Sequence, residues 1–160
     1  MQIRPCNDDD LSAIHAIQLK CPQAAQWRLE DYLKLANDPL GMVLVAEAGD
    51  EHAAGVAGFA AFHRVLDEAE LRNMAVDPAH QRKGIARALL AAGIDLLKRS
   101  GVCRLFLEVR ASNQPAIALY RSADFRLTHT RRDYYHDPAE DALVMARDLT
   151  RSSESSPVSR

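Results

Sequence analysis

Cysteine is scarce in this sequence, and its few thiols do not suggest a pairing scheme. Cys6, Cys21 and Cys103 are spread over 160 residues. An odd number at wide spacings fits neither a disulfide framework nor a zinc site. The six histidines form no H-E-x-x-H pattern and no tight cluster, so we predict no metal. Unpaired thiols are typical of a reducing compartment, and we expect a cytoplasmic protein.

The chain also lacks an excess of charge and any long apolar run. Its formal net charge is −2, whereas a general nucleic-acid binder usually has a strong basic excess. Residues 1–10 lack the apolar core of a signal peptide, and no run reaches the length of a membrane span. We therefore expect neither nucleic acid nor membrane as a direct partner.

The length and composition predict one globular domain. Hydrophobic residues make up 48% of the 160 residues, which is enough for a single core. No internal repeat stands out. Residues 151–160 contain many serines and one aliphatic residue, too little apolar surface to offset the entropy of ordering. We predict a domain over 1–150, followed by a disordered tail over 151–160.

Apolar periodicity and turn residues predict a mixed α/β fold. Alternating or continuous apolar runs indicate strands, and spacings of three and four indicate helices. A sheet of about six to seven strands with helices on both faces is the expected architecture. The predicted strands cover 2–5, 41–48, 54–63, 68–76, 103–109, 125–130 and 142–145, with a turn at 50–52, and the predicted helices cover 7–19, a segment starting at residue 26, 84–100 and 113–123.

A small basic segment between a strand and a long helix is the strongest signal. Residues 81–86 read Gln-Arg-Lys-Gly-Ile-Ala, and Arg87 follows. A helix N-terminus has unpaired N–H groups and a positive dipole end, so it attracts phosphate. Gly84 and Ala86 allow a ligand to approach the backbone closely. The chain has neither G-x-x-x-x-G-K-[ST] nor G-x-G-x-x-G, which excludes a nucleoside-triphosphate loop and argues against a dinucleotide site.

Glu108 is a carboxylate in an otherwise apolar strand. We interpret the run 103–109 as a strand buried on both faces. A buried glutamate needs either an ion-pair partner or a functional role. One reading is a general base. The other is an ion pair with Arg104, Arg110 or another basic side chain. The sequence favours the two readings equally.

Tyr120 lies seven residues after Asn113, about two helical turns, so both fall on one helix face. A helical tyrosine with its hydroxyl at the rim of the core is the commoner situation. Ser112 or Asn113 is suited to cap this helix.

Taken together, these motifs resemble the GNAT superfamily of N-acetyltransferases, whose pyrophosphate-binding signature is Q/R-x-x-G-x-G/A. The resemblance covers the last half of the domain. It is similar to the RimI branch, bacterial enzymes that acetylate the N-terminal alanine of a small-subunit ribosomal protein. Asp124 stands where the family often has glycine, and we expect a left-handed backbone there. The supporting segments are 107–113 (L-E-V-R-A-S-N), 116–120 (A-I-A-L-Y), 131–135 (R-R-D-Y-Y) and 140–145 (E-D-A-L-V-M).

The resemblance implies the GNAT fold and a role for each matching residue. Acetyl-CoA would be the co-substrate and no metal would be needed. Glu108 would be the general base, acting through water, and Tyr120 the proton donor to the leaving thiolate. Tyr134 and Tyr135 would line the peptide groove. The cofactor would contact the backbone of Met74, Ala75 and Val76, the loop residues Arg82, Lys83, Gly84, Ile85, Ala86 and Arg87, and Asn113.

The chemistry of amine acetylation fits these residues. Only a neutral amine attacks a thioester, and an α-amine has a pKa of about 8 against roughly 10.4 for lysine, so a modest base suffices. A bulged strand near Ala75 would offer an N–H to the developing oxyanion. Three acids precede the cofactor strand, and we hypothesise that Glu68, Asp67 or Glu70 reads a basic residue of the peptide. A solvated charged turn explains them equally well.

Three functions follow in order of preference. The first is acetylation of a protein N-terminal α-amine by a monomer or weak dimer, with a small-subunit ribosomal protein as the expected partner. The second keeps acetyl-CoA but acetylates a lysine, a polyamine or another small amine. The third is an acetyl-CoA sensor without turnover, and the presence of both Glu108 and Tyr120 argues against it.

Overall fold

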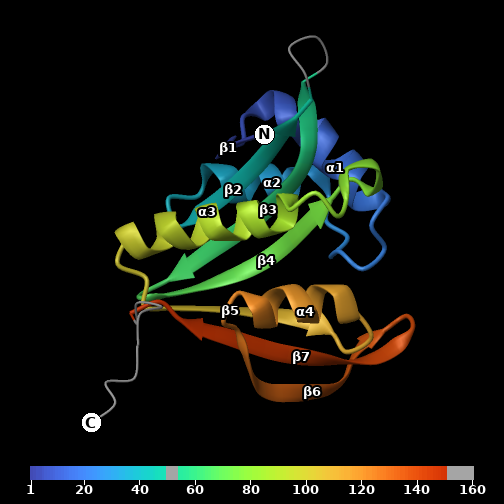
Figure 1. Cartoon of the computed structure of the whole chain (residues 1–160), viewed down its shortest axis with the longest axis vertical. Coiled ribbons are helices and arrows are strands. Elements are labelled where there is room, and N and C mark those ends of the chain that lie inside the picture. The colour runs from blue at the N-terminus through green and yellow to red at the C-terminus, as the bar shows by residue number, and fades with distance from the viewer. Residues whose placement is uncertain (50–53, 151–160) are drawn as a thin grey trace.

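A computed structural model of the chain describes residues 1–49 and 54–150. The predicted turn at 50–52 and the predicted tail over 151–160 lie outside the described residues. In the described part, seven strands form one sheet in the order β1-β2-β3-β4-β5-β7-β6 (Figure 1). The strands are β1 (Gln2–Pro5), β2 (Gly41–Ala48), β3 (Gly55–Val65), β4 (Glu68–Val76), β5 (Arg104–Arg110), β6 (Arg126–His136) and β7 (Ala139–Asp148).

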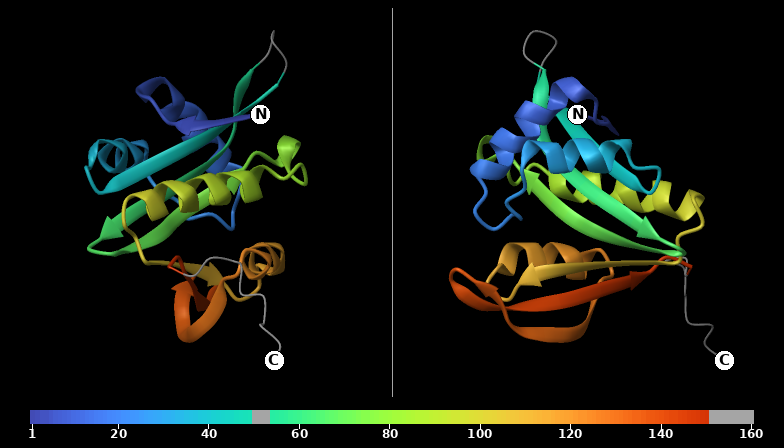
Figure 2. Two further views of the ribbon diagram at one scale, coloured as in Figure 1. Left: turned by 60° about the vertical axis from the view of Figure 1, so that its left-hand side comes forward. Right: turned by 180° about the vertical axis from the view of Figure 1, so that it is seen from behind.

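Helices cover both faces of the sheet, as the sequence predicts. They are α1 (Leu11–Leu19), α2 (Leu29–Asn37), α3 (Ile85–Arg99) and α4 (Gln114–Ser122), with short 3-10 turns at Asp8–Asp10 and Pro78–His80. Helices α3 and α4 lie in front of the sheet in Figure 1, and α1 and α2 come to the front when the molecule is seen from behind (Figure 2, right). No helix in the described ranges is long and apolar enough to cross a membrane.

Each face has its own apolar core. On one face Ile14 and Tyr32 pack on Val45 and Phe59. On the other, the row of apolar residues in α3, including Leu89 and Ile94, packs on the opposite side of the same strands. The apolar stripe of α3 is buried in full, at Ile85, Leu89, Leu90, Ile94 and Leu97. Gly101 adopts a left-handed backbone with φ +83° just after that helix, a conformation that favours glycine at a helix end.

Two sets of predicted boundaries are wrong. Helix α2 begins at Leu29 rather than at residue 26, because the Gln26 amide donates to the Cys21 and Ala24 carbonyls, and the Trp27 carbonyl accepts from Gln18. Strands β6 and β7 are longer than predicted. Their pairing continues to His136 and Ala139 through exposed residues that carry no apolar pattern.

Strands β4 and β5 separate after a short paired stretch. They run parallel and pair from Glu68 and Arg104 to Leu71 and Leu107. Beyond that point β4 continues to Val76 and β5 to Arg110, and the strands diverge into a fork (Figure 1). From Asn73 to Val76, β4 pairs only with β3 on its other side, so one backbone edge of β4 has no partner strand in the described chain.

Candidate active site

The predicted phosphate loop has two residues with left-handed backbone ahead of α3. Gly84 precedes α3 with φ +80°, and Arg82 has φ +64°. A Cβ on Gly84 would meet no atom within 4 Å, so the backbone conformation is what favours glycine. The first helical hydrogen bond joins the Ala88 N–H to the Gly84 carbonyl at 3.0 Å. The N–H groups of residues 85–87 therefore precede the helical ladder.

Two contacts hold this loop against the end of β4. The Gln81 side-chain amide donates to the Val76 carbonyl at 3.1 Å, and the Cys21 thiol donates to the same oxygen at 3.3 Å. Asp77 accepts from the Ala79 N–H at 2.9 Å and pairs with Lys20 at 3.1 Å. The Val76 carbonyl is thus occupied, which leaves the Val76 N–H and the Met74 backbone for the predicted cofactor contact. The predicted contact with the Ala75 backbone is less favourable, because Ala75 lies opposite Phe59 and its backbone groups face β3.

Glu108 lies where the fork opens, on the sheet face that bears α1 and α2. Its neighbours Leu107 and Val109 point into the opposite core, so β5 is buried on one face only, and the predicted double burial is wrong. The Glu108 side chain is 19% exposed, and Oε1 lies 3.4 Å from Arg131 Nε. Glu108 therefore forms an ion pair, as one of the two interpretations predicts. Its partner is Arg131 of β6 and not Arg104 or Arg110.

A bulge in β6 brings the two predicted tyrosines to Glu108. The register shifts between Arg131 and Tyr135, opposite a single residue of β7, and Asp133 in between has φ +51°. A hydrogen bond to the Glu108 carboxylate raises the pKa of Tyr134. The Arg110 guanidinium lies over the Tyr135 ring at 4.0 Å. Glu108, Tyr134 and Tyr135, far apart in the sequence, thus form one cluster.

Tyr120 sits on α4, on the far side of this cluster. It is 8% exposed and packs against Phe125 with ring centroids 5.8 Å apart. Burial raises its pKa, and the nearby Tyr135 adds to that shift. The Asn113 side chain accepts from the Ala116 N–H at 3.3 Å and caps α4 as predicted. Asp124 has φ +66°, which confirms the left-handed backbone expected there.

The acidic residues before the fork separate into two environments. Glu68 pairs with Arg104 at 3.5 Å, with both side chains 45% exposed, at the paired end of the strands. Glu70 is half-buried and close enough to Glu108 for the two carboxylates to influence each other. The structure therefore groups Glu70, and not Glu68, with the predicted catalytic carboxylate. Alternation along β4 places Glu68 and Glu70 on the same face, so the sequence offers no signal for this choice.

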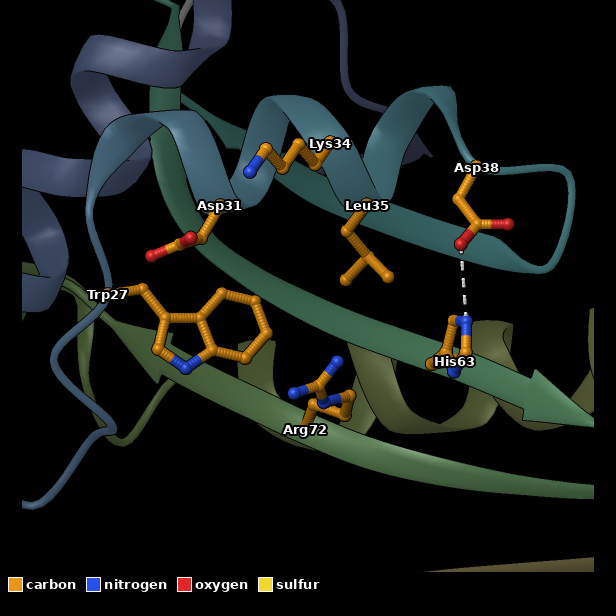
Figure 3. A pocket seen from close by; sticks show the side chains of 7 residues that line it. All are labelled: Trp27, Asp31, Lys34, Leu35, Asp38, His63 and Arg72. Atoms are coloured by element: carbon orange, nitrogen blue, oxygen red, sulfur yellow. Dashed lines mark hydrogen bonds and ion pairs between the residues drawn. The ribbon is translucent and has the colours of Figure 1, made fainter.

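The bulge of β4 is at Arg72 and not near Ala75. The register shifts between Leu71 and Asn73, so Arg72 is the extra residue and its guanidinium lies 5.2 Å from the centre of the Trp27 ring. Both residues line a cavity of about 380 Å³ between α2 and the sheet. Figure 3 shows this cavity with the His63–Asp38 contact of 3.3 Å at one end. Its lining residues are Trp27, Asp31, Lys34, Leu35, Asp38, His63 and Arg72.

Sequence reasoning missed this cavity because no motif marks its residues. They come from the connections before and after α2, from α2 itself and from two strands, and only the packing of α2 on the sheet brings them together. No group of three or more potential metal-ligating side chains occurs within the described ranges.

Residues 11–125 match the acetyltransferase (GNAT) family. The chain is 55% identical over 93 residues to the [ribosomal protein bS18]-alanine N-acetyltransferase of Escherichia coli, which is 57% of this chain and 63% of the relative. The chain therefore spans less than two thirds of that relative's length in this match. It is 31% identical over 143 residues to the putative [ribosomal protein bS18]-alanine N-acetyltransferase of Bacillus subtilis, with 89% and 92% covered.

A solved structure extends the likeness to almost the whole chain. The crystal structure of the ribosomal-protein-S18-alanine N-acetyltransferase from Escherichia coli is 38% identical and superposes with a TM-score of 0.80. The match covers 96% of this chain and 97% of that one. This likeness confirms the predicted α/β fold with a mixed sheet.

Proposed function

The chain belongs to the acetyltransferase (GNAT) family, and we propose that it moves an acetyl group from acetyl-CoA to the N-terminal α-amine of an alanine-starting protein. The two bacterial relatives support ribosomal protein bS18 as that acceptor. Such an acceptor, together with three cysteines free of disulfides, would place the reaction in the cytoplasm.

The α3 start and the free edge of β4 are suited to hold the cofactor. The N–H groups of residues 85–87 and the exposed side chains of Arg82, Lys83 and Arg87 would bind the pyrophosphate. The unpaired edge of β4 at Met74 and Val76 would bind an extended chain as an added strand does. Acetyl-CoA, when bound, supplies the acetyl group as a thioester.

Glu108 and Tyr120 would handle the two proton transfers of the reaction. The amine nitrogen forms a bond to the thioester carbon and loses a proton, which Glu108 would accept through water. The carbon–sulfur bond breaks, and the sulfur takes up a proton that Tyr120 would donate. A phenol with the ordinary tyrosine pKa of about 10 is protonated at neutral pH, and burial raises the pKa of Tyr120 further, so Tyr120 would carry a proton when the thiolate leaves.

The position of Glu108 carries the proposal. Its carboxylate lies at the opening of the fork, on the face opposite the phosphate loop helix, and contacts Arg131 and Tyr134 of the β6–β7 hairpin. An amine that enters between α2 and this hairpin therefore meets a base, while the cofactor approaches from the α3 side.

Release of CoA with three acceptors tests this function. The first is an alanine-starting basic peptide, the second is the same peptide blocked at its α-amine with a free lysine, and the third is a polyamine. We expect turnover of the first alone. We expect Glu108→Gln to lower kcat about 100-fold while acetyl-CoA binding stays unchanged, with the exposed α3 variant Asp95→Asn as the control.

Each of the other possible results contradicts one part of this proposal. Turnover confined to lysine or polyamine would keep the fold and cofactor but overturn the acceptor. Cofactor binding without turnover of any amine, including the intact bS18 protein, would support a sensor. A Glu108→Gln variant as fast as the wild type would remove the general base from the proposal.

A further inference from the structure

Glu70 is a half-buried carboxylate beside the site that the reaction as proposed does not use. It lies on β4 opposite His63 of β3 and Phe106 of β5. The next residue, Leu71, points into the α3–α4 core. Because side chains alternate along a strand, Glu70 shares the face of Glu108. Both carboxylates therefore face the side from which the acceptor would enter.

The cations near Glu70 are engaged elsewhere. Arg72 lies over the Trp27 ring at 5.2 Å. Arg131 lies 3.4 Å from Glu108 and over the Tyr134 ring at 5.4 Å. His63 contacts Asp38 at 3.3 Å. Among the described residues no cation forms an ion pair with Glu70, and that leaves one carboxylate of the site without a partner.

The electrostatics agree with this geometry. Burial raises the pKa of the Glu70 carboxyl, the Glu108 carboxylate raises it further, and Arg72, His63 and Arg131 only partly oppose the shift. A second carboxylate in a half-buried place is unfavourable without a cation. An added cation would offset the repulsion between the Glu70 and Glu108 carboxylates.

The spacing indicates which cation fits. Strands are about 4.8 Å apart and rise about 3.3 Å per residue. Glu108 is two residues beyond Phe106, the partner of Glu70, so the two glutamate Cα atoms are about 8 Å apart. The attacking amine at Glu108 must be neutral and cannot supply the charge. In the acceptor peptide, the second residue lies one Cα step, about 3.8 Å, beyond the first. A long side chain at this second position reaches from there to Glu70.

We propose that Glu70 is a specificity-determining residue that binds a basic side chain, lysine or arginine, at the second position of the acceptor peptide. This inference rests on the proposed function, because it assumes that a peptide α-amine lies at Glu108. It assigns Glu70 no part in proton transfer. Glu68, whose charge is paired with Arg104 at the other end of the strands, takes no part in this selection.

Four peptides that begin with alanine and differ only at position two, as Arg, Lys, Gln or Glu, test the assignment. For the wild type we expect kcat/KM to be about 5- to 10-fold higher for Arg and Lys than for Gln, mainly through KM. Glu70→Gln should remove the preference with kcat for the Gln peptide unchanged. Glu70→Lys should reverse it in favour of the Glu peptide. Asp95→Asn, an exposed change on α3, should keep the wild-type pattern.

Several results would overturn the assignment. These are a wild type that shows no preference at position two, a preference that survives Glu70→Gln, and a preference that Glu68→Gln removes. A large fall of kcat in Glu70→Gln for every peptide would make Glu70 a catalytic base. A wild type that acetylates none of the four α-amines, yet turns over lysine, would instead contradict the proposed function.

Discussion

Asn73 on β4 and Ala25 in the connection between α1 and α2 form two hydrogen bonds. The Asn73 amide donates to the Ala25 carbonyl at 2.9 Å, and its oxygen accepts from the Ala25 N–H at 3.1 Å. Asn73 also donates to the Tyr32 hydroxyl at 2.8 Å, and that hydroxyl donates to Gln18. This network fixes the connection that carries Trp27 to the strand that carries Glu70.

We expect Asn73→Ala to weaken acceptor binding more than cofactor binding. Asn73 is 5% exposed, so its loss leaves the Ala25 backbone groups without their partner at a cost of about 2 kcal/mol in the free energy of unfolding. Peptide KM should rise while KM for acetyl-CoA stays within twofold. Steady-state kinetics well below the unfolding temperature measure both, and an equal rise of the two KM values would argue against a local role.

Tyr120→Phe is expected to lower kcat about 100-fold without changing the pH dependence between pH 6 and 9. Burial raises the pKa of Tyr120 above its ordinary value of about 10. The phenol therefore stays protonated throughout this range, and its ionisation adds no alkaline decline of kcat. Measurements of kcat for the variant and the wild type at a series of pH values between 6 and 9 test this. A variant within twofold of the wild type would exclude Tyr120 as the proton donor.

Gly93→Ala should destabilise the fold. A Cβ on Gly93 would lie 2.3 Å from Cζ of Phe62, which is fully buried and cannot move aside. We expect a loss of about 1–3 kcal/mol in the free energy of unfolding, although alanine favours a helix by about 1 kcal/mol. Urea unfolding measures this. Gly55→Ala is the matched control, since a Cβ there meets no atom within 4 Å.

Asp10 should stabilise the protein at neutral pH and lose that effect in acid. Its carboxylate accepts from Arg4 at 2.7 and 3.0 Å and from the Asn7 N–H, and hydrogen bonding to Arg4 lowers the pKa of Asp10. A lowered folded-state pKa contributes stability above the unfolded pKa of about 3.9, and this is lost as pH falls through the folded value.

Asp10→Asn is therefore expected to lose about 2 kcal/mol at pH 7, and the difference from the wild type should shrink below about pH 4. Urea unfolding at pH 7, 5 and 3 gives the comparison. Asp9→Asn, an exposed neighbour, serves as the control. A difference that stays constant with pH would show that the charge of Asp10 does not matter.

The sequence alone determined the order of the helices and strands and the position of the loop at 81–86. Local signals are sufficient for the helix, because apolar spacing places Leu89 and Ile94 on one helix face. The left-handed backbone at Asp124 is predicted from the glycine that the resembling family often has there. The GNAT signature at 81–86 is likewise contiguous. The cofactor and catalytic roles assigned to these residues remain predictions.

Only the tertiary structure decided which distant side chains lie beside Glu108, on the sheet face that bears α1 and α2. Glu68 and Glu70 look alike in sequence, and both lie in the stretch where β4 pairs with β5. Glu68, at the first pair, forms an ion pair with Arg104, whereas Glu70, next to the last pair, lies near Glu108. The bulges at Arg72 and between Arg131 and Tyr135 carry no sequence pattern. Register and strand divergence arise from the packing of the whole sheet, so a carboxylate's neighbours cannot be deduced from its own segment.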